Sequence, residues 1–320
     1  MPFLTANSYF GVAKETTYGT AASVSTFTPI SGPKLTPTLK WINDPDFRGS
    51  PVGSYDQVPG VRNDDFDGKV FMYGDVYPNY LLGILGGPDT VASVTASTWT
   101  HTIGVINAAS VGSQMPSYTI VNNSVNATYQ ITAARAVDLS ISATADAAVE
   151  TTLKYEGNIS TTITAPTINE TTAHLVPAWS CSASIGGASV AVIEAVTLDI
   201  KRGTAPIFTL GQQGPYNNFA GPIDVSGSFT FIMEVGETNY ANALTRDPQT
   251  VLLQFSDPAS SDTVLFQMSS VQLEDPVIDQ GKAMIELGTK FTAIANTTDA
   301  TGGGYSPIKT VTTNGVSTAY

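Results

Sequence analysis

The strongest constraint on this fold is a period-two alternation of apolar and polar residues that recurs along the chain. It is clearest over Val137–Ser142, Val196–Lys201 and Ser228–Phe231. Successive side chains of a strand point to opposite faces, so this pattern places one face in a core and the other in water. Gly, Asn, Asp and Pro separate the alternating runs, as turns require. The sequence therefore predicts an antiparallel all-β fold.

Two short segments depart from the alternation and predict minor helices. Val76–Gly86 and Glu237–Leu244 are each long enough for two or three helical turns. Asp75 precedes the first and Glu237 opens the second, and acidic or capping residues favour a helix N-terminus. A Gly-Gly-Pro and an Asp-Pro sequence follow, and both are expected to end a helix. The helix side chains expected to make contacts are Tyr77, Tyr80, Leu81, Tyr240 and Leu244.

Composition excludes several classes of protein. The chain has 320 residues, and its 14 basic and 27 acidic residues give a formal net charge of -13. Hydrophobic residues make up 42%, which is enough apolar surface to exclude a disordered acidic chain. No run approaches roughly 18 consecutive apolar residues, so no membrane span is expected. Met1–Lys14 lacks a basic start followed by an apolar run, so we expect no secretory signal.

Few residues suggest catalytic or metal chemistry. The single cysteine, Cys181, excludes an intramolecular disulfide, and its alternating surroundings predict a small buried apolar residue. His101 and His174 have no Cys or carboxylate at metal-ligand spacing, which favours structural or surface roles over a zinc or Ser-His-Asp site. The sequence therefore predicts no cofactor, no metal and no enzymatic activity.

One acidic segment resembles the first half of a calcium-binding loop. Asn63, Asp65 and Asp67 stand at alternate positions and Gly68 follows them. Position twelve of such a loop would be Gly74, where a bidentate Glu is needed. We therefore interpret Asn63–Gly68 as a solvated hairpin turn.

The order of motifs indicates an internal repeat. The pattern G-x-Y-[D/N]-x-x-x-G begins at Gly53 and again at Gly214, 161 positions later. Asn79-Tyr80 matches Asn239-Tyr240 at an offset of 160, inside the two predicted helices. Such spacing over a whole domain indicates that one unit occurs twice. Chance similarity within low-complexity β sequence is the alternative interpretation.

The repeat predicts two tandem domains. Residues 1–165 form the first domain with an N-terminal arm, 166–298 the second, and 299–320 a C-terminal arm or flexible tail. Near the ends of the halves, Glu150 and Lys154 match Glu286 and Lys290 at an offset of 136. The offset between matching residues thus falls from 160 to 136 along the repeat, which predicts about 24 extra residues in the first domain, near 88–115.

Each half also carries a long loop rich in Pro and Gly. These loops are Asp44–Gly60 and Ala205–Gly221, and long structureless loops in compact domains are usually functional. Aromatic side chains on such loops commonly anchor a partner surface, although they can also fold back on their own domain. The residues expected to make contacts between subunits or between rings of subunits are Phe47, Tyr55, Phe208, Tyr216 and Phe219.

The start of the chain resembles the major tail tube proteins of long-tailed, siphovirus-type bacteriophages. The resemblance lies in Phe10–Thr20 (FGVAKETTYGT) and in the step Phe27-Thr28-Pro29. The long loop after the first strand, the single helix and the closing strands of Val271–Ala295 are also similar to that family. The resemblance covers most of the chain, from Met1 to about Thr298.

This resemblance implies a β-sandwich or barrel subunit with one flanking α-helix, which closes into rings by joining sheet edges. The rings stack into a tube that encloses double-stranded DNA and the tape-measure protein without binding them tightly. It also implies contacts with the tail terminator and distal tail proteins, a place in the virion, assembly in the host cytoplasm, and no membrane partner.

This chain departs from the family pattern because it holds the fold twice. Family tubes usually have six folds per ring, so two folds per chain predict a homotrimeric, pseudo-hexameric ring, with a homohexamer as the alternative. About four lumen strands per fold give about 24 strands, beyond the roughly 16–18 that leave an aqueous channel. Every sheet edge would then be used by a neighbour.

The acidic balance suits a conduit for DNA. Basic residues along a channel would release counterions from phosphates and hold the duplex, whereas acidic or neutral groups would let it slide. We therefore expect some of the 13 excess acids to face the lumen. Two alternatives are a β-rich adhesin or virion decoration module that binds a receptor or glycan, and a hydrolase. The hydrolase is disfavoured because no paired carboxylates recur at equivalent places.

Overall fold

A computed structural model describes residues 7–25, 27–46, 48–108, 112–124, 126–190, 192–234 and 238–320. The fold is all-β with two short helices, as the alternation predicts. The elements up to residue 163 are β1 (Tyr9–Lys14), β2 (Phe27–Thr28), β3 (Ile30–Asp44), β4 (Asp56–Phe71), α1 (Tyr77–Leu85), β5 (Thr90–Thr95), β6 (Thr98–Gly104), β7 (Tyr118–Asn123), β8 (Thr128–Thr144), β9 (Glu150–Gly157) and β10 (Thr161–Ile163).

The remaining elements begin with a single 3-10 turn at Ala178–Ser180. They are β11 (Ser182–Ile185), β12 (Ala188–Val190), β13 (Ile193–Ile207), β14 (Asn217–Ile232), α2 (Asn239–Thr245), β15 (Gln249–Ser256), β16 (Thr263–Asp279), β17 (Glu286–Ala293) and β18 (Lys309–Asn314).

The two halves of the chain contain the same series of antiparallel ladders. In the first half β3 pairs with β4, β4 with β9, β9 with β8, and β8 with β7. In the second half β13 pairs with β14, β14 with β17, β17 with β16, and β16 with β15. The shorter strands follow the same order, since β1 flanks β7 as β11 flanks β15, and β10 flanks β8 as β18 flanks β16.

Bulges occupy matching positions in these ladders. The ladder of β7 with β8 and the ladder of β15 with β16 each contain a register shift after their first pair. The pairs on either side are Tyr118–Ala134 and Ile120–Ile131 in one ladder, and Gln249–Val271 and Val251–Met268 in the other. A bulge adds a residue to one strand only, so it marks a position along a ladder. We call two residues equivalent when they hold the same place in matching ladders.

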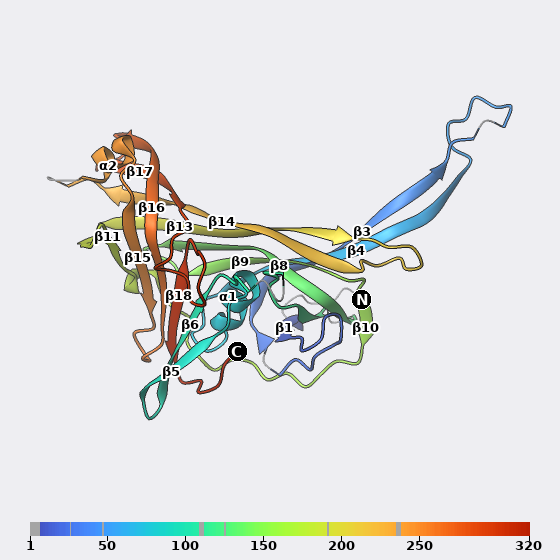
Figure 1. The fold of residues 1–320 in the computed structure, drawn as a ribbon, viewed down its shortest axis with the longest axis horizontal. Helices are drawn as coiled ribbons and strands as arrows, with labels where there is room; N and C mark the ends of the chain where they lie inside the picture. The colour runs from blue at the N-terminus through green and yellow to red at the C-terminus, as the bar shows by residue number, and fades with distance from the viewer. Residues whose placement is uncertain are drawn as a thin grey trace.

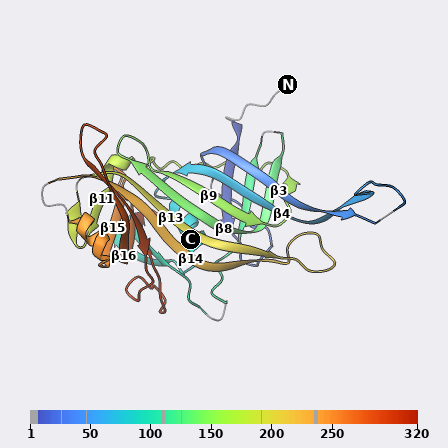
Figure 2. The same cartoon turned by 90° about the horizontal axis from the view of Figure 1, so that it is seen from above.

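Among the described residues two ladders join the halves: β18 pairs with β6, and β8 pairs with β13 to form one continuous sheet. Asp138–Thr144 of β8 pairs antiparallel with Ala195–Lys201 of β13. We call this ladder the internal seam. It completes one sheet in the order β3-β4-β9-β8-β13-β14-β17-β16, whose strands lie side by side in Figure 2.

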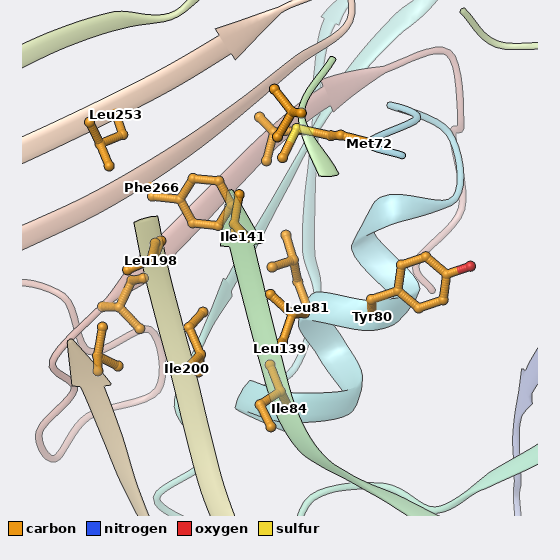
Figure 3. Packing of buried hydrophobic residues seen from close by; sticks show 14 of the residues in the cluster. Met72, Tyr80, Leu81, Ile84, Leu139, Ile141, Leu198, Ile200, Leu253 and Phe266 are labelled. Atoms are coloured by element: carbon orange, nitrogen blue, oxygen red, sulfur yellow. The ribbon is translucent and has the colours of Figure 1, made fainter. Parts of the chain in front are cut away.

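The core lies on one face of this sheet. Strand residues such as Leu139, Ile141, Leu198 and Ile200 are almost fully buried and pack towards α1 (Figure 3). Their neighbours in sequence point to the opposite, water-facing side, which we call the wet face. Each fully buried large apolar side chain contributes roughly 1.5–3 kcal/mol of hydrophobic stabilisation. The alternation in the sequence is therefore the direct cause of this two-faced sheet.

Both predicted helices form, but the start of α1 differs from expectation. Val76 is the N-cap of α1 and makes no side-chain capping bond. The carboxylate of Asp75 instead accepts a hydrogen bond from the Thr171 hydroxyl at 2.6 Å, so the prediction that it caps the helix is wrong. Gly86 ends α1 in the left-handed conformation, with a φ of 75°, which a glycine adopts without steric cost. Glu237 lies outside the described residues.

The C-terminal segment is part of the body of the protein. The strand β18 pairs with β16 on one side and with β6 on the other. Its side chains Thr310, Thr312 and Asn314 are almost fully buried. The prediction of an arm or flexible tail over 299–320 is therefore wrong for this strand. The hairpin of β5 and β6 lies within 88–115, where the sequence predicts extra residues.

Two hairpins extend beyond the core in different ways. The β3–β4 hairpin projects away from the body on its own (Figure 1). The β13–β14 hairpin runs across the top of the molecule towards the base of the β3–β4 hairpin (Figure 1). The two hairpins hold matching places in the strand order, so the difference between them lies in what they contact.

Candidate assembly surface

The first notable feature is an unpaired edge at each end of the eight-stranded sheet. Within the described residues, β3 forms a ladder with β4 alone. The C-terminal half of β16 pairs with β17 on one side, and the ladder with β15 stops at Val271. Unpaired edges of this length usually invite another strand unless the protein blocks them. These two edges are therefore the natural places for a contact with another chain.

Exposed apolar side chains lie along both edges. On β3, Trp41 is 54% exposed and Ile42 is 58% exposed. On β16, Val277 is 62% exposed and Ile278 is 40% exposed. Large apolar side chains gathered at unpaired edges are typical of surfaces that become covered by a partner. Sequence reasoning missed these four residues, although Trp41 and Ile42 stand beside each other where the alternation of β3 breaks down.

The loop of the β13–β14 hairpin is fixed to the first half of the chain. The backbone N–H of Arg62 donates to the Gln213 carbonyl at 3.0 Å, and the Gln213 side chain donates to the Gly60 carbonyl at 2.9 Å. Further along, the N–H of Asn218 donates to the Tyr18 hydroxyl at 2.8 Å. These bonds hold the hairpin against β4 and the N-terminal segment.

The β3–β4 hairpin has a different environment. Its loop is stabilised mainly from within, because the Tyr55 hydroxyl donates to the Ser50 carbonyl at 3.1 Å and Arg48 lies 5.1 Å from the centre of the Tyr55 ring. Tyr55 thus packs on its own loop, which is the alternative considered for the loop aromatics. Phe47 lies outside the described residues.

The other predicted loop aromatics lie on the β13–β14 hairpin. Tyr216 is 65% exposed and Phe219 is 46% exposed, whereas Phe208 is half-buried. The structure therefore leaves Tyr216 and Phe219 free to contact another molecule, and it brings neither of them near Tyr55. Their role in contacts between subunits stays a prediction.

The predicted helix residues divide into buried and exposed groups. Tyr77, Tyr80 and Leu81 on α1 are almost fully buried. The Tyr80 hydroxyl donates to the Thr28 hydroxyl at 2.7 Å, and the Tyr77 and Thr151 hydroxyls are 2.9 Å apart. These side chains hold α1 against the sheets and are not available to a partner. On α2, Tyr240 packs partly against the core and Leu244 is 63% exposed.

An open cavity lies beside the free part of β14. Its volume is about 890 Å³, and Gly221, Ile223, Thr292 and Ala295 are among the residues that line it. The ladder between β14 and β17 ends at Ser226–Thr292, so it does not reach Ile223. The cavity therefore lies beside a stretch of β14 that has no neighbouring strand from β17, where the Gly221 and Ala220 carbonyls accept bonds from the side chains of Arg202 and Gln114.

The wet face of the sheet carries more acids than bases. The acidic residues at its outward positions include Asp65, Asp67, Asp138, Glu150, Glu156, Asp199, Asp224, Glu274, Asp279 and Glu286, and the basic ones include Lys34, Lys69, Lys154, Lys201 and Lys290. Partial burial, with a smaller contribution from Asp199, raises the pKa of Asp138. Partial burial also raises the pKa of Asp65, assisted by Asp64 and Asp67. By its excess of acidic over basic residues, the face carries a net negative charge.

The segment Asn63–Gly68 is part of β4 and not a turn. Asp64 is fully buried, and its carboxylate accepts bonds from Arg62 at 2.6 and 2.7 Å and from the Ser160 N–H at 2.9 Å. The interpretation as a solvated hairpin turn is therefore wrong, because the segment is a strand in which Asp64 has tertiary partners while Asp65 and Asp67 point to the wet face. No group of three or more metal-binding side chains occurs among the residues that the structure describes.

The two histidines and the cysteine have structural or surface positions. His101 is fully buried, with Nδ1 at 2.8 Å from Asp89 and Nε2 at 2.9 Å from the Val316 carbonyl. The His174 side chain is 67% exposed. Cys181 is only partly buried, and this burial raises the pKa of its thiol to about 11, so the thiol is protonated at neutral pH.

A family model supplies the identity. The model described as "Phage tail tube protein" matches residues 5–316, which is nearly the whole chain. No curated protein matches the chain. In the described part of the chain, no helix is long and apolar enough to span a membrane. Tail tube proteins are structural components of the virion that assemble into a tube, and they are not enzymes. The chain therefore belongs to the phage tail tube protein family.

Proposed function

We propose that this chain assembles into closed rings that stack to form the tail tube of a siphovirus-type phage, through which DNA is ejected into the host. The observation that carries the proposal is the pair of unpaired edges at opposite ends of one sheet. A sheet with complementary edges at its two ends can join head to tail, and head-to-tail contacts that close give a ring. The family match supports the same assembly.

The chain carries the tail tube fold twice in this proposal, as two tandem domains. Support comes from the identical order of ladders in the two halves and from their matching bulges. Three copies then supply six folds, in a pseudo-hexameric ring. Each copy contributes eight strands to the inner sheet, so three copies give about 24 strands, enough to enclose an aqueous channel.

The wet face lines the lumen in this proposal, because the opposite face is buried beneath α1. Its surplus of acids suits a channel that passes DNA without holding it, since like charges repel the phosphates. The tape-measure protein occupies the same lumen before ejection. The tail terminator and distal tail proteins cover the two ends of the tube, and assembly takes place in the host cytoplasm.

Electron microscopy of the purified protein tests this function. Rings or tubes with a central hole are the expected result. Isolated monomers that remain monomeric at high concentration and bind a glycan would contradict it and would support a decoration or adhesin module.

A further inference from the structure

The chain contains a contact between its own two halves that can serve as the template for a contact between copies. We infer that the β3–β4 hairpin and the edge of β3 dock on the second half of a neighbouring copy, in the way that β13–β14 and β13 dock on the first half of their own chain. This inference rests on the proposed ring and adds its register and its contact residues.

The bulges fix which residues are equivalent. The ladder of β3 with β4 shifts register between Leu39 and Trp41, and the ladder of β13 with β14 shifts between Arg202 and Thr204. The offset from β3 to β13 is therefore 163 positions (202 against 39). The offset from β8 to β16 is 137 positions, as the pairs Ile120–Ile131 and Val251–Met268 require.

Applying these offsets to the residue pairs of the internal seam predicts which residues pair in the ladder between two copies. The internal seam pairs Ser142 with Thr197, Ile141 with Leu198, and Ser140 with Asp199. Each equivalent pair joins a β16 residue of one copy to a β3 residue of the neighbouring copy. The pairs are Asp279 with Lys34, Ile278 with Leu35, and Val277 with Thr36.

The chemistry of these pairs is complementary. Asp279 and Lys34 have opposite charges, and Ile278 and Leu35 are both apolar, as are Ile141 and Leu198 in the internal seam. Opposite charges and apolar pairs directly across an antiparallel ladder are favourable. The next pair in the register is Pro276 with Pro37, and neither residue has an N–H to donate. The new ladder is therefore expected to end there.

The hairpin contacts can be transferred in the same way. Gly60 and Arg62, which bind the Gln213 loop, are equivalent to Gly221 and Ile223 at an offset of 161. Gly221 and Ile223 line the open cavity of the second half. The cavity thus lies where the loop of the β3–β4 hairpin from a neighbouring copy is expected.

Trp41 is the main apolar residue expected to enter this cavity. It is equivalent to Thr204, whose hydroxyl donates to Glu156 in the first half. Glu156 in turn is equivalent to Thr292, which lines the cavity. Trp41 is 54% exposed in the isolated chain, and its insertion beside Thr292 would cover it. The occupant of the cavity is therefore a second copy of this chain.

Disulfide crosslinking tests the register. With Cys181→Ala to remove the native thiol, Thr36→Cys combined with Val277→Cys is expected to give a closed, covalent trimer after oxidation of assembled protein. Thr38→Cys with Val277→Cys keeps the side chains on the same face but shifts the register by two, and it is expected to give at least tenfold less crosslinking. Ser140→Cys with Asp199→Cys crosslinks within one chain and is expected to run as a monomer after denaturation.

The outcomes separate this inference from the proposed function. Rings in which the shifted pair crosslinks instead would overturn the register while leaving the ring intact. Protein that forms no ring in microscopy, with or without the cysteines, would overturn both.

Charge exchange and removal of Trp41 give a second, independent test. Lys34→Asp and Asp279→Lys are each expected to raise the concentration needed for assembly at least tenfold, and the double variant is expected to restore it. Trp41→Ala is also expected to raise the concentration needed for assembly at least tenfold, without changing the melting temperature. The control is Trp179→Ala, which removes a 67% exposed tryptophan outside β3 and β16 and is expected to leave that concentration unchanged. Unchanged assembly of Trp41→Ala and of both single charge variants would overturn the inference.

Discussion

The side-chain amide of Gln213 donates a hydrogen bond to the carbonyl oxygen of Gly60 at 2.9 Å, across 153 positions of sequence. This bond, with the one from the Arg62 N–H to the Gln213 carbonyl, holds the β13–β14 hairpin against the first half of the chain. The β3–β4 hairpin has no comparable support among the contacts of the described residues. Of these two hairpins, which hold matching places in the strand order, one is therefore docked and the other undocked.

Hydrogen exchange should distinguish these two forms. The Arg62 amide is expected to be protected both in the unassembled chain and in rings, because its acceptor belongs to the same chain. The equivalent Ile223 amide is expected to gain at least tenfold protection on assembly only. NMR or mass spectrometry can measure the exchange of both amides. The Lys34→Asp variant serves as the unassembled form and is compared with assembled wild type. Equal exchange of the Ile223 segment in both would argue against hairpin docking.

A buried hydroxyl pair should contribute measurably to stability. Tyr80→Phe removes the bond from the Tyr80 hydroxyl to Thr28 and leaves the Thr28 hydroxyl without this partner. The expected loss in free energy of unfolding is about 1 kcal/mol, the usual net value of one buried hydrogen bond. Denaturant unfolding measures it, with Tyr305→Phe at a 64% exposed site as the control. A loss equal to that of the control would show that the bond contributes nothing.

Asp64 should make stability depend on acid pH. Burial alone would raise the pKa of Asp64, but hydrogen bonds from Arg62 and Ser160 together outweigh it and hold the pKa below its ordinary value of 3.8. A lowered folded pKa contributes stability that is present above 3.8 and is lost as the pH falls through the folded value.

Asp64→Asn is therefore expected to destabilise the protein by about 2 kcal/mol at pH 7, since it leaves Arg62 without its carboxylate. The difference from wild type should shrink as the pH falls below about 4. Thermal unfolding between pH 2 and pH 7 checks both statements. A difference that stays constant over this range would contradict the assigned role of the carboxylate charge.

Much of the fold could be predicted from the sequence because its strands are locally encoded. The alternation in Val137–Ser142 and Val196–Lys201 follows directly from one buried and one wet face. Gly86 was predictable as the end of α1, because helices commonly end at a residue in the left-handed conformation and glycine adopts that conformation most easily. The extra residues expected near 88–115 from the spacing of the repeat stay a prediction; the β5–β6 hairpin lies in this stretch.

Other features depend on contacts between distant residues and could not be predicted. The run Asn63–Gly68 has the composition of a turn, yet Asp64 is satisfied by Arg62 and Ser160 inside a strand. The Gly-rich segment 302–304 suggested a flexible tail, but β18 after it finds partners in β6 and β16. The motifs at Gly53 and Gly214 are 161 positions apart, whereas the ladders place β3 and β13 163 positions apart, because the first hairpin loop is two residues longer.

Charge on the wet face should control DNA passage. Asp67→Lys with Asp199→Lys replaces two acids on this face with bases, and the new charges should attract phosphates as DNA moves through the tube. Phage carrying both changes is expected to eject DNA severalfold more slowly, and the effect should weaken at high salt. Asp247→Lys, at an exposed position in the turn between α2 and β15 and not in a strand of this sheet, serves as the control. Ejection kinetics that match wild type would mean that the wet face does not line the lumen.

The most direct test of the account is the number of chains in one ring, measured by end-on cryo-electron microscopy together with the native mass of the same particles. Three chains and six similar lobes around a central hole are expected. A ring of six chains, or a three-chain particle whose sheets do not join at β3 and β16, would contradict it.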